Sequence, residues 1–136
     1  QPEEDKDLLK SLNSKNIDLI RLVTPTTDVE RLKKILKFAS GFLYYVTITG
    51  ITGQNSANIE VLKKSINTIK SYTKLPIIAG FGIKNKNDVE QISSFTDGVV
   101  VGSSIVNIIK DNLNDKNKMI NEIKVFTKDL KDGIKE

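Results

Sequence analysis

The sequence feature that most constrains the fold is a repeated unit: a short apolar run, a glycine-containing turn, and then residues with helical apolar spacing. It is clearest at two glycine stretches, 79–83 and 101–105, which follow the apolar runs 75–79 and 98–101. Continuous apolar runs of this kind are typical of parallel strands buried on both faces. Glycine at such a junction lets backbone amides approach a ligand, and the helix that follows offers unpaired N–H groups to an anion. The two glycine stretches therefore predict a phosphate-binding site.

The unit of strand followed by helix is expected four times, after an opening helix at 1–13. The expected strands are 17–23, 42–48, 75–79 and 98–101, and each is followed by apolar residues at helical spacing. This alternation favours a parallel sheet with right-handed crossovers. All four strand C-terminal ends then lie on one face, where ligands bind in such folds. We therefore expect the two glycine stretches to meet there.

Polar residues near the helix starts give local predictions. Thr27 and Glu30 have the spacing of a capping box, and Asn87 with Glu90 has the same spacing at the start of the helix after the third strand. Residues 49–56 are too rich in turn formers to be helix or strand. We expect a loop there, after the second strand.

Composition excludes several kinds of chemistry. The 136 residues contain no Cys and no His, so disulfides, a thiol nucleophile, imidazole catalysis and serine–histidine triads cannot be built from this chain alone. The net charge is +4, but the lysines are interleaved with Asp and Glu, which argues against nucleic acid as a partner. No apolar run approaches the roughly 20 residues that span a bilayer. We expect one domain, soluble and cytoplasmic, with no membrane partner.

Candidate site residues follow from the glycine stretches. Backbone amides at Gly82 and Gly102 and the Ser103 hydroxyl are expected to bind phosphate oxygens. In the second expected strand, Tyr44 and Tyr45 point to opposite faces, and the pattern alone does not decide which one faces inward. No carboxylate falls at an expected strand C-terminal end, where a barrel enzyme needs its proton-transfer groups. The sequence thus predicts a phosphate site without acid–base machinery.

Three segments carry a resemblance to a known family: 44–53, 79–83 and 99–106. Gly-Phe-Gly and Gly-Ser turns occur in many phosphate-binding barrels, but the Gly-Ile-Thr-Gly loop after a tyrosine-containing strand, at this distance from them, is more specific. The three segments resemble the tryptophan synthase alpha subunit family, and the resemblance extends over essentially the whole chain. It implies an α/β fold, the C-terminal half of a TIM (β/α)₈ barrel with strands five to eight.

The resemblance implies a carbon–carbon lyase of tryptophan biosynthesis, which cleaves indole-3-glycerol phosphate to indole and glyceraldehyde 3-phosphate. Tyr44 would face the active site and assist catalysis, and Thr52 would support the catalytic Asp when its loop closes over the substrate. The residues implied to hold the substrate phosphate are Gly53, Gly80, Phe81, Gly82, Ile83, Gly102 and Ser103. No metal and no cofactor are implied in this chain. Pyridoxal phosphate would belong to a partner beta subunit, in an assembly of two alpha and two beta subunits.

The chain departs from the family pattern in lacking the early strand–helix units that supply the catalytic Glu and Asp. Four strands of a closed eight-stranded barrel leave two open edges and an exposed inner face. We therefore expect 1–136 to be a single partial domain of a longer polypeptide, inactive as a lyase until the N-terminal half of the barrel is supplied. The alternative is a non-catalytic half-barrel that binds a phosphate or flavin and forms a homodimer.

Overall fold

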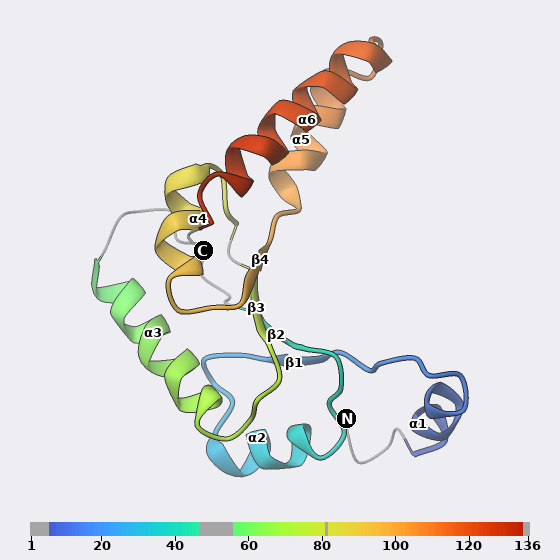
Figure 1. The fold of residues 1–136 in the computed structure, drawn as a ribbon, viewed down its shortest axis with the longest axis vertical. Coiled ribbons are helices and arrows are strands. Elements are labelled where there is room, and N and C mark those ends of the chain that lie inside the picture. The colour runs from blue at the N-terminus through green and yellow to red at the C-terminus, as the bar shows by residue number, and fades with distance from the viewer. Residues whose placement is uncertain (1–5, 47–55, 81, 135–136) are drawn as a thin grey trace.

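The computed structural model describes residues 6–46, 56–80 and 82–134. Six helices and four strands alternate along these residues, as Figure 1 shows. In chain order they are α1 (Lys6–Asn13), β1 (Arg21–Val23), α2 (Val29–Leu36), β2 (Leu43–Val46), α3 (Ser56–Lys70), β3 (Ile77–Gly80), α4 (Lys86–Ser93), β4 (Gly98–Val100), α5 (Ser103–Asp111) and α6 (Lys116–Lys131). The predicted alternation of strand and helix after an opening helix is confirmed.

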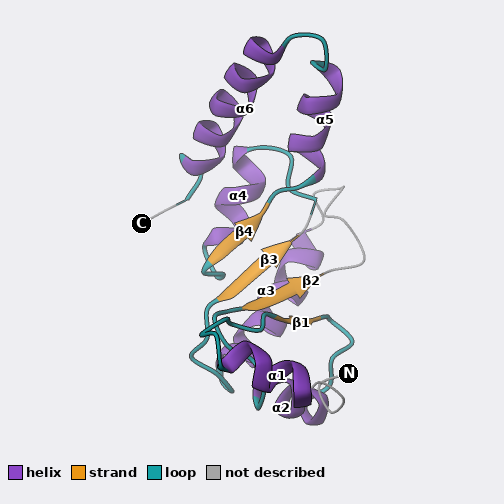
Figure 2. Ribbon diagram, turned by 90° about the vertical axis from the view of Figure 1, so that its right-hand side faces the viewer, coloured by secondary structure: helices purple, strands orange, loops and turns teal. Residues whose placement is uncertain are grey.

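The four strands form one parallel sheet in the order β1-β2-β3-β4. Figure 2 shows them side by side and pointing the same way. Neighbours in the sheet are thus consecutive in sequence, as in the wall of a barrel. In a doubly wound sheet the strand order would reverse at one point. The arrangement is the half-barrel that the sequence predicts.

The two faces of the sheet differ in how they are covered. Val23, Tyr45 and Ala79 occupy one row across β1, β2 and β3, and all three are buried in the cluster formed with the helices. Figure 1 shows α3 and α4 on the same side of the sheet. Leu22 and Tyr44 occupy the adjacent row and face the other way, and Leu22 is 62% exposed. The helix-covered face corresponds to the outside of a barrel wall, and the open face to its inside.

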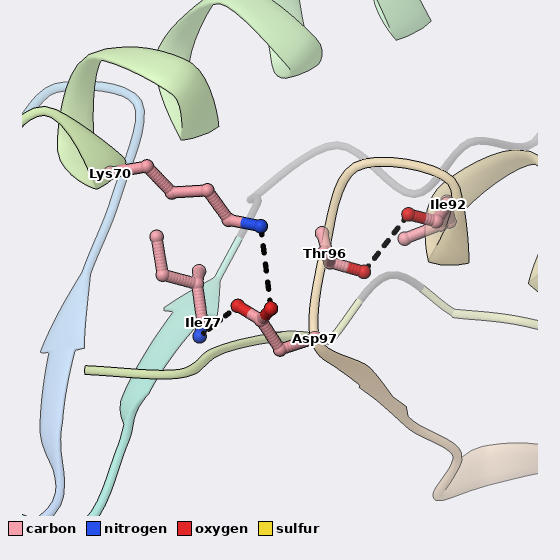
Figure 3. Close-up of polar contacts among 5 residues, drawn as sticks. All are labelled: Lys70, Ile77, Ile92, Thr96 and Asp97. Atoms are coloured by element: carbon pink, nitrogen blue, oxygen red, sulfur yellow. Dashed lines mark hydrogen bonds and ion pairs between the residues drawn. The ribbon is translucent and has the colours of Figure 1, made fainter. Parts of the chain in front are cut away.

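Asp97 joins two strands and a helix at the N-terminal edge of the sheet (Figure 3). Its Oδ2 accepts a hydrogen bond from the Ile77 amide at 2.8 Å, and its own amide donates to the Ile77 carbonyl at 2.9 Å. Its Oδ1 lies 3.4 Å from Nζ of Lys70, at the end of α3. Beside it, the buried Thr96 hydroxyl donates to the Ile92 carbonyl at 2.9 Å. These contacts hold β3 against β4 at the edge opposite to the glycine stretches.

Helices α5 and α6 pack against each other and extend beyond the sheet (Figure 1). The buried Asn112, at the end of α5, donates from Nδ2 to the Ile108 carbonyl at 2.9 Å and to Oε2 of Glu122 in α6 at 2.7 Å. Leu130 of α6 reaches the core, whereas none of the α5 residues is buried. The two helices are thus tied to each other more firmly than α5 is tied to the sheet.

The predicted cap of α2 is wrong by one residue. Asp28 caps the helix, and its Oδ1 accepts a hydrogen bond from the Arg31 amide at 2.7 Å. The Thr27 hydroxyl accepts from the Thr24 amide at 3.0 Å, so it closes the turn before the helix instead of capping it. Two capping residues stand side by side in the sequence, and the turn uses the first of them.

The predicted cap of α4 is wrong by two residues. Asn85 caps the helix, because its Oδ1 accepts from the Asp88 amide at 3.0 Å. Oδ2 of Asp88 accepts in turn from the Lys84 amide at 2.9 Å. These two side-chain contacts start the helix before Asn87, which then lies inside it.

The first strand is shorter than the expected run 17–23. Only Arg21–Val23 pairs with β2. Before it, the Leu19 amide donates to Oγ of Ser40 at 2.9 Å, and the Ser40 amide donates to the Leu19 carbonyl at 3.3 Å. The start of the apolar run therefore pairs with the turn before β2. The loop expected at 49–56 lies outside the described residues, apart from Ser56, which begins α3.

Candidate anion-binding site

The two glycine stretches lie next to each other at the C-terminal edge of the sheet. β3 ends at Gly80 and β4 at Val100, and these two residues are partners in the β3–β4 register. From there the chain leads through Gly82 into α4 and through Gly102 into α5. The prediction that the parallel sheet brings the two stretches together is confirmed.

Gly82 has a left-handed backbone, with φ at +55°, which L side chains rarely adopt. It is exposed, and apart from its chain neighbours no described residue comes within 4 Å of where a Cβ would stand. The next residue, Ile83, is 2% exposed and belongs to the core cluster. Only the backbone of Ile83 can therefore contribute to ligand binding, while its side chain anchors the stretch.

Gly102 caps α5 without a side-chain hydrogen bond, and the first turn of α5 has no acidic residue. In α2, α4 and α6, the other helices whose N-caps are described, Asp28, Asn85 and Asp115 supply such a bond. The φ of Gly102 is −117°, which other residues adopt, and no described residue crowds its Cβ position. Gly102 therefore supplies no side-chain partner to the first amides of α5, and unpaired amides at a helix N-terminus are suited to binding an anion.

The two serines that begin α5 differ in their contacts. Ser103 is exposed beside Gly102, as a phosphate-binding hydroxyl requires. Oγ of Ser104 donates a hydrogen bond to the Ile83 carbonyl at 2.9 Å and so links the two glycine stretches. The sequence pattern indicates no role for Ser104. No local signal reveals its partner, which lies 21 residues earlier in the chain.

Tyr44 lies on the open face of the sheet, over Gly80. A Cβ added at Gly80 would overlap the Tyr44 hydroxyl and would lie 2.7 Å from Cζ of the ring. Glycine at the end of β3 therefore makes room for the tyrosine. This placement answers the question that strand alternation leaves open, since Tyr44 faces the side without helices and Tyr45 faces the core.

Tyr45 is buried between β2 and the helices, away from the open face. Burial raises the pKa of its hydroxyl above the ordinary value, and a hydrogen bond with Ser65 of α3 works against this rise. A cavity of about 120 Å³ beside it is lined mainly by α2, α3 and the turn before α2. Tyr45 and this cavity belong to the packing of the outer layer and not to the candidate site.

The remaining predicted site residues, Thr52, Gly53 and Phe81, lie outside the described residues. Of the carboxylates that follow β1 and β3 in the described part, Asp28 accepts a hydrogen bond from the Arg31 amide, Asp88 accepts one from the Lys84 amide, and Glu30 pairs with Lys33 at 2.8 Å. Residues 6–46, 56–80 and 82–134 contain no group of three or more acidic side chains placed to hold a metal ion. Nor does this part of the chain contain a helix long and apolar enough to cross a membrane. The described site is thus suited to binding an anion, with no free carboxylate in place for proton transfer.

The fold is half of a (β/α)₈ barrel, with a candidate anion-binding site at the C-terminal ends of two adjacent strands. The family model described as tryptophan synthase alpha chain matches residues 1–135. The chain therefore belongs to the tryptophan synthase alpha chain family.

Curated and solved relatives agree with this assignment. The tryptophan synthase alpha chain of Petrotoga mobilis is 42% identical over 129 residues, which make up 95% of this chain and 50% of that protein. Tryptophan synthase subunit alpha from Campylobacter jejuni is 41% identical, with a TM-score of 0.79 over 91% of this chain and 49% of that one. Subunit alpha from Legionella pneumophila is 29% identical, with a TM-score of 0.82 over 98% of this chain and 48% of that one. The chain spans about half the length of the relatives it matches.

Proposed function

We propose that this chain is the substrate-phosphate-binding half of a tryptophan synthase alpha subunit, the lyase that cleaves indole-3-glycerol phosphate to indole and glyceraldehyde 3-phosphate. The observation that carries the proposal is the pairing of two glycine stretches at adjacent strand ends, beside a helix N-terminus without a side-chain cap. Backbone amides and the Ser103 hydroxyl are all hydrogen-bond donors, which suits a phosphate ester. Membership of the family supports the choice of reaction.

The proposed roles follow the placement of the residues. Gly82 and Gly102 let backbone amides approach the phosphate, and Ser103 adds its hydroxyl. Tyr44 assists from the open face of the sheet, and Thr52 supports the catalytic Asp. The full set proposed to surround the phosphate is Gly53, Gly80, Phe81, Gly82, Ile83, Gly102 and Ser103.

Cleavage of the bond between indole and the glycerol chain requires two proton transfers. One proton is added to the indole ring carbon that loses the bond, and one is removed from the hydroxyl on the neighbouring glycerol carbon, which becomes the aldehyde. Asp28 and Asp88 already accept hydrogen bonds from backbone amides, those of Arg31 and Lys84. We therefore propose that the catalytic Glu and Asp come from the N-terminal half of the barrel, and that this chain alone is inactive as a lyase.

The proposed partners follow from the same half-barrel. The N-terminal half of the barrel would cover the open face, on which Leu22 is 62% exposed and Val100 is 37% exposed. The completed alpha subunit would pass indole to a beta subunit that carries pyridoxal phosphate, in an assembly of two alpha and two beta subunits in the cytoplasm. No cofactor is proposed for this chain itself.

Titration with inorganic phosphate and glycerol 3-phosphate tests the site in the full-length protein. Gly102→Ala is expected to weaken binding by about tenfold or more, because an added methyl group beside the phosphate would lengthen the hydrogen bonds from the backbone amides, and charge-assisted bonds of this kind are worth roughly 1.5–3 kcal/mol. Its fold should persist, since alanine tolerates the observed φ. Asn107→Ala, an exposed change further along α5, serves as the matched control. Equal affinity of Gly102→Ala and wild type would contradict the site.

The open face favours one alternative, a homodimer. A second copy related by a two-fold axis along the barrel would bring β4 of one copy beside β1 of the other and cover the same apolar side chains. Sedimentation of the chain, alone and with the N-terminal half supplied, separates the two proposals. A stable phosphate-binding dimer that gains no lyase activity from the N-terminal half would favour the alternative.

A further inference from the structure

We propose that Ser104 is a positioning residue, which holds the two glycine stretches in a single arrangement that can bind phosphate. This inference rests on the proposed phosphate site and assigns the two neighbouring serines of α5 different tasks. Ser103 contacts the phosphate, and Ser104 fixes the distance between the two sets of donors.

The contact joins two segments that are otherwise anchored separately. Oγ of Ser104, half-buried in the first turn of α5, donates to the Ile83 carbonyl at 2.9 Å. Ile83 is held by its side chain, which is 2% exposed in the core cluster. Because Gly82 directly precedes Ile83 and Gly102 lies two residues before Ser104, this one bond relates the two glycines to each other.

The N-terminus of α5 has few other restraints among the described residues. None of the α5 residues is buried, and Gly102 supplies no side-chain hydrogen bond to the helix. The start of α4, by contrast, is fixed by two side-chain contacts, from the Asp88 amide to Asn85 and from the Lys84 amide to Asp88. The bond from Ser104 therefore restrains the more weakly held of the two helix starts, and it does so from the side of the first glycine stretch.

Helix geometry separates the two hydroxyls. Successive residues of an α-helix point about 100° apart, so the side chains of Ser103 and Ser104 point in different directions. With Ser104 directed to the Ile83 carbonyl, Ser103 is the serine left on the exposed side of the turn. Loss of the Ser104 hydroxyl should thus weaken phosphate binding although it touches no phosphate.

The test follows the amide resonances of Gly82 and Gly102 while inorganic phosphate is titrated into the full-length protein. In the wild type, both amides should shift with the same midpoint. In Ser104→Ala, affinity should fall about three- to tenfold, the range expected for one net hydrogen bond. The chemical-shift change of the Gly82 amide should decrease more than that of the Gly102 amide. The reason is that the phosphate would stay at the N-terminus of α5, where Gly102 lies, while Gly82 would no longer be held beside it.

Two variants of nearly equal shape, Ser104→Thr and Ser104→Val, separate the effect of the hydroxyl on phosphate binding from an effect on stability. Ser104→Thr retains a hydroxyl and should bind phosphate as the wild type does, whereas Ser104→Val should bind as weakly as Ser104→Ala. Ser94→Ala is the matched control, because it removes a similar side-chain bond, from Oγ to the Gln91 carbonyl at 2.8 Å, at an exposed site.

Two results would overturn the inference, and they are distinguishable. If the wild type binds phosphate and Ser104→Val binds it equally well, Ser104 has no positioning role, even if the variant melts at a lower temperature. If the wild type fails to bind phosphate at all, the proposed function fails, and the role of Ser104 fails with it.

Discussion

At the scale of single residues, glycine stands at three positions at the C-terminal edge of the sheet, for a different physical reason at each. Gly82 has a positive φ, which excludes most other residues. Gly80 lies under the Tyr44 ring, so a side chain there would collide. Gly102 has neither constraint among the described residues, and under the proposed function glycine there lets the phosphate approach the backbone. Substitution at Gly102 is therefore the change that separates ligand binding from folding.

Gly80→Ala is expected to destabilise the protein by displacing the Tyr44 ring. The added Cβ would overlap the Tyr44 hydroxyl, and overpacking of this kind costs about 1–3 kcal/mol. Tyr44→Ala removes the overlapping atoms, so the double variant should be less destabilised than the sum of the two single variants. Urea unfolding of all four proteins measures this coupling. Strictly additive free energies would contradict the position of Tyr44 over Gly80.

Tyr45→Phe is expected to change how stability depends on pH. Burial raises the pKa of Tyr45 in the folded state, so between about pH 10 and that raised pKa the unfolded state releases the proton and the folded state keeps it. Stability therefore falls as the pH rises through this window, and phenylalanine removes that part of the fall.

The measurement is the free energy of unfolding from pH 7 to pH values above about 10. Tyr72→Phe, at a tyrosine that is 44% exposed, is the control and should keep the wild-type slope. A slope above pH 10 that is the same in Tyr45→Phe and the wild type would show that Tyr45 is not buried as described.

At the scale of elements, periodicity predicts the helices and strands well and their ends less well. Apolar spacing correctly predicts a helix after β2, because the long amphipathic face of α3 fixes it against the core. The cap of α2 is misplaced, because Thr27 and Asp28 are both good capping residues and only the preceding turn decides between them. The bond from Ser104 to Ile83 could not be predicted, because it depends on the pairing of β3 with β4.

Asn85→Ala is expected to destabilise the protein by about 1 kcal/mol, the usual cost of losing an N-cap side chain. The structure places the Asn85 side chain on the Asp88 amide at 3.0 Å. Asn87→Ala is the matched control, because this residue is exposed inside the helix and alanine favours helix there. Chemical denaturation of both variants gives the comparison. A larger loss of unfolding free energy in Asn87→Ala than in Asn85→Ala would show that Asn87 is the N-cap, as the sequence predicts.

At the scale of the whole molecule, the strand order is that of a barrel wall, and helices cover only one face of the sheet. The parallel order was predictable, because strands and helices alternate and each crossover returns the chain to the same edge. The face on which Tyr44 lies was not predictable from the strand pattern, because alternation in β2 is equally compatible with Tyr44 or Tyr45 facing the inside of the barrel. The open face carries apolar side chains such as Leu22, and a second set of four strands would cover them.

Indole release from indole-3-glycerol phosphate tests the proposed function most directly. It is measured for the 136-residue chain alone and for the chain joined to a polypeptide that supplies the other four strands of the barrel. No indole is expected from the chain alone, whereas the joined form should release indole, with a KM raised about tenfold or more by Gly102→Ala. Indole from the chain alone, or a joined form that Gly102→Ala leaves unaffected, would contradict the proposed function.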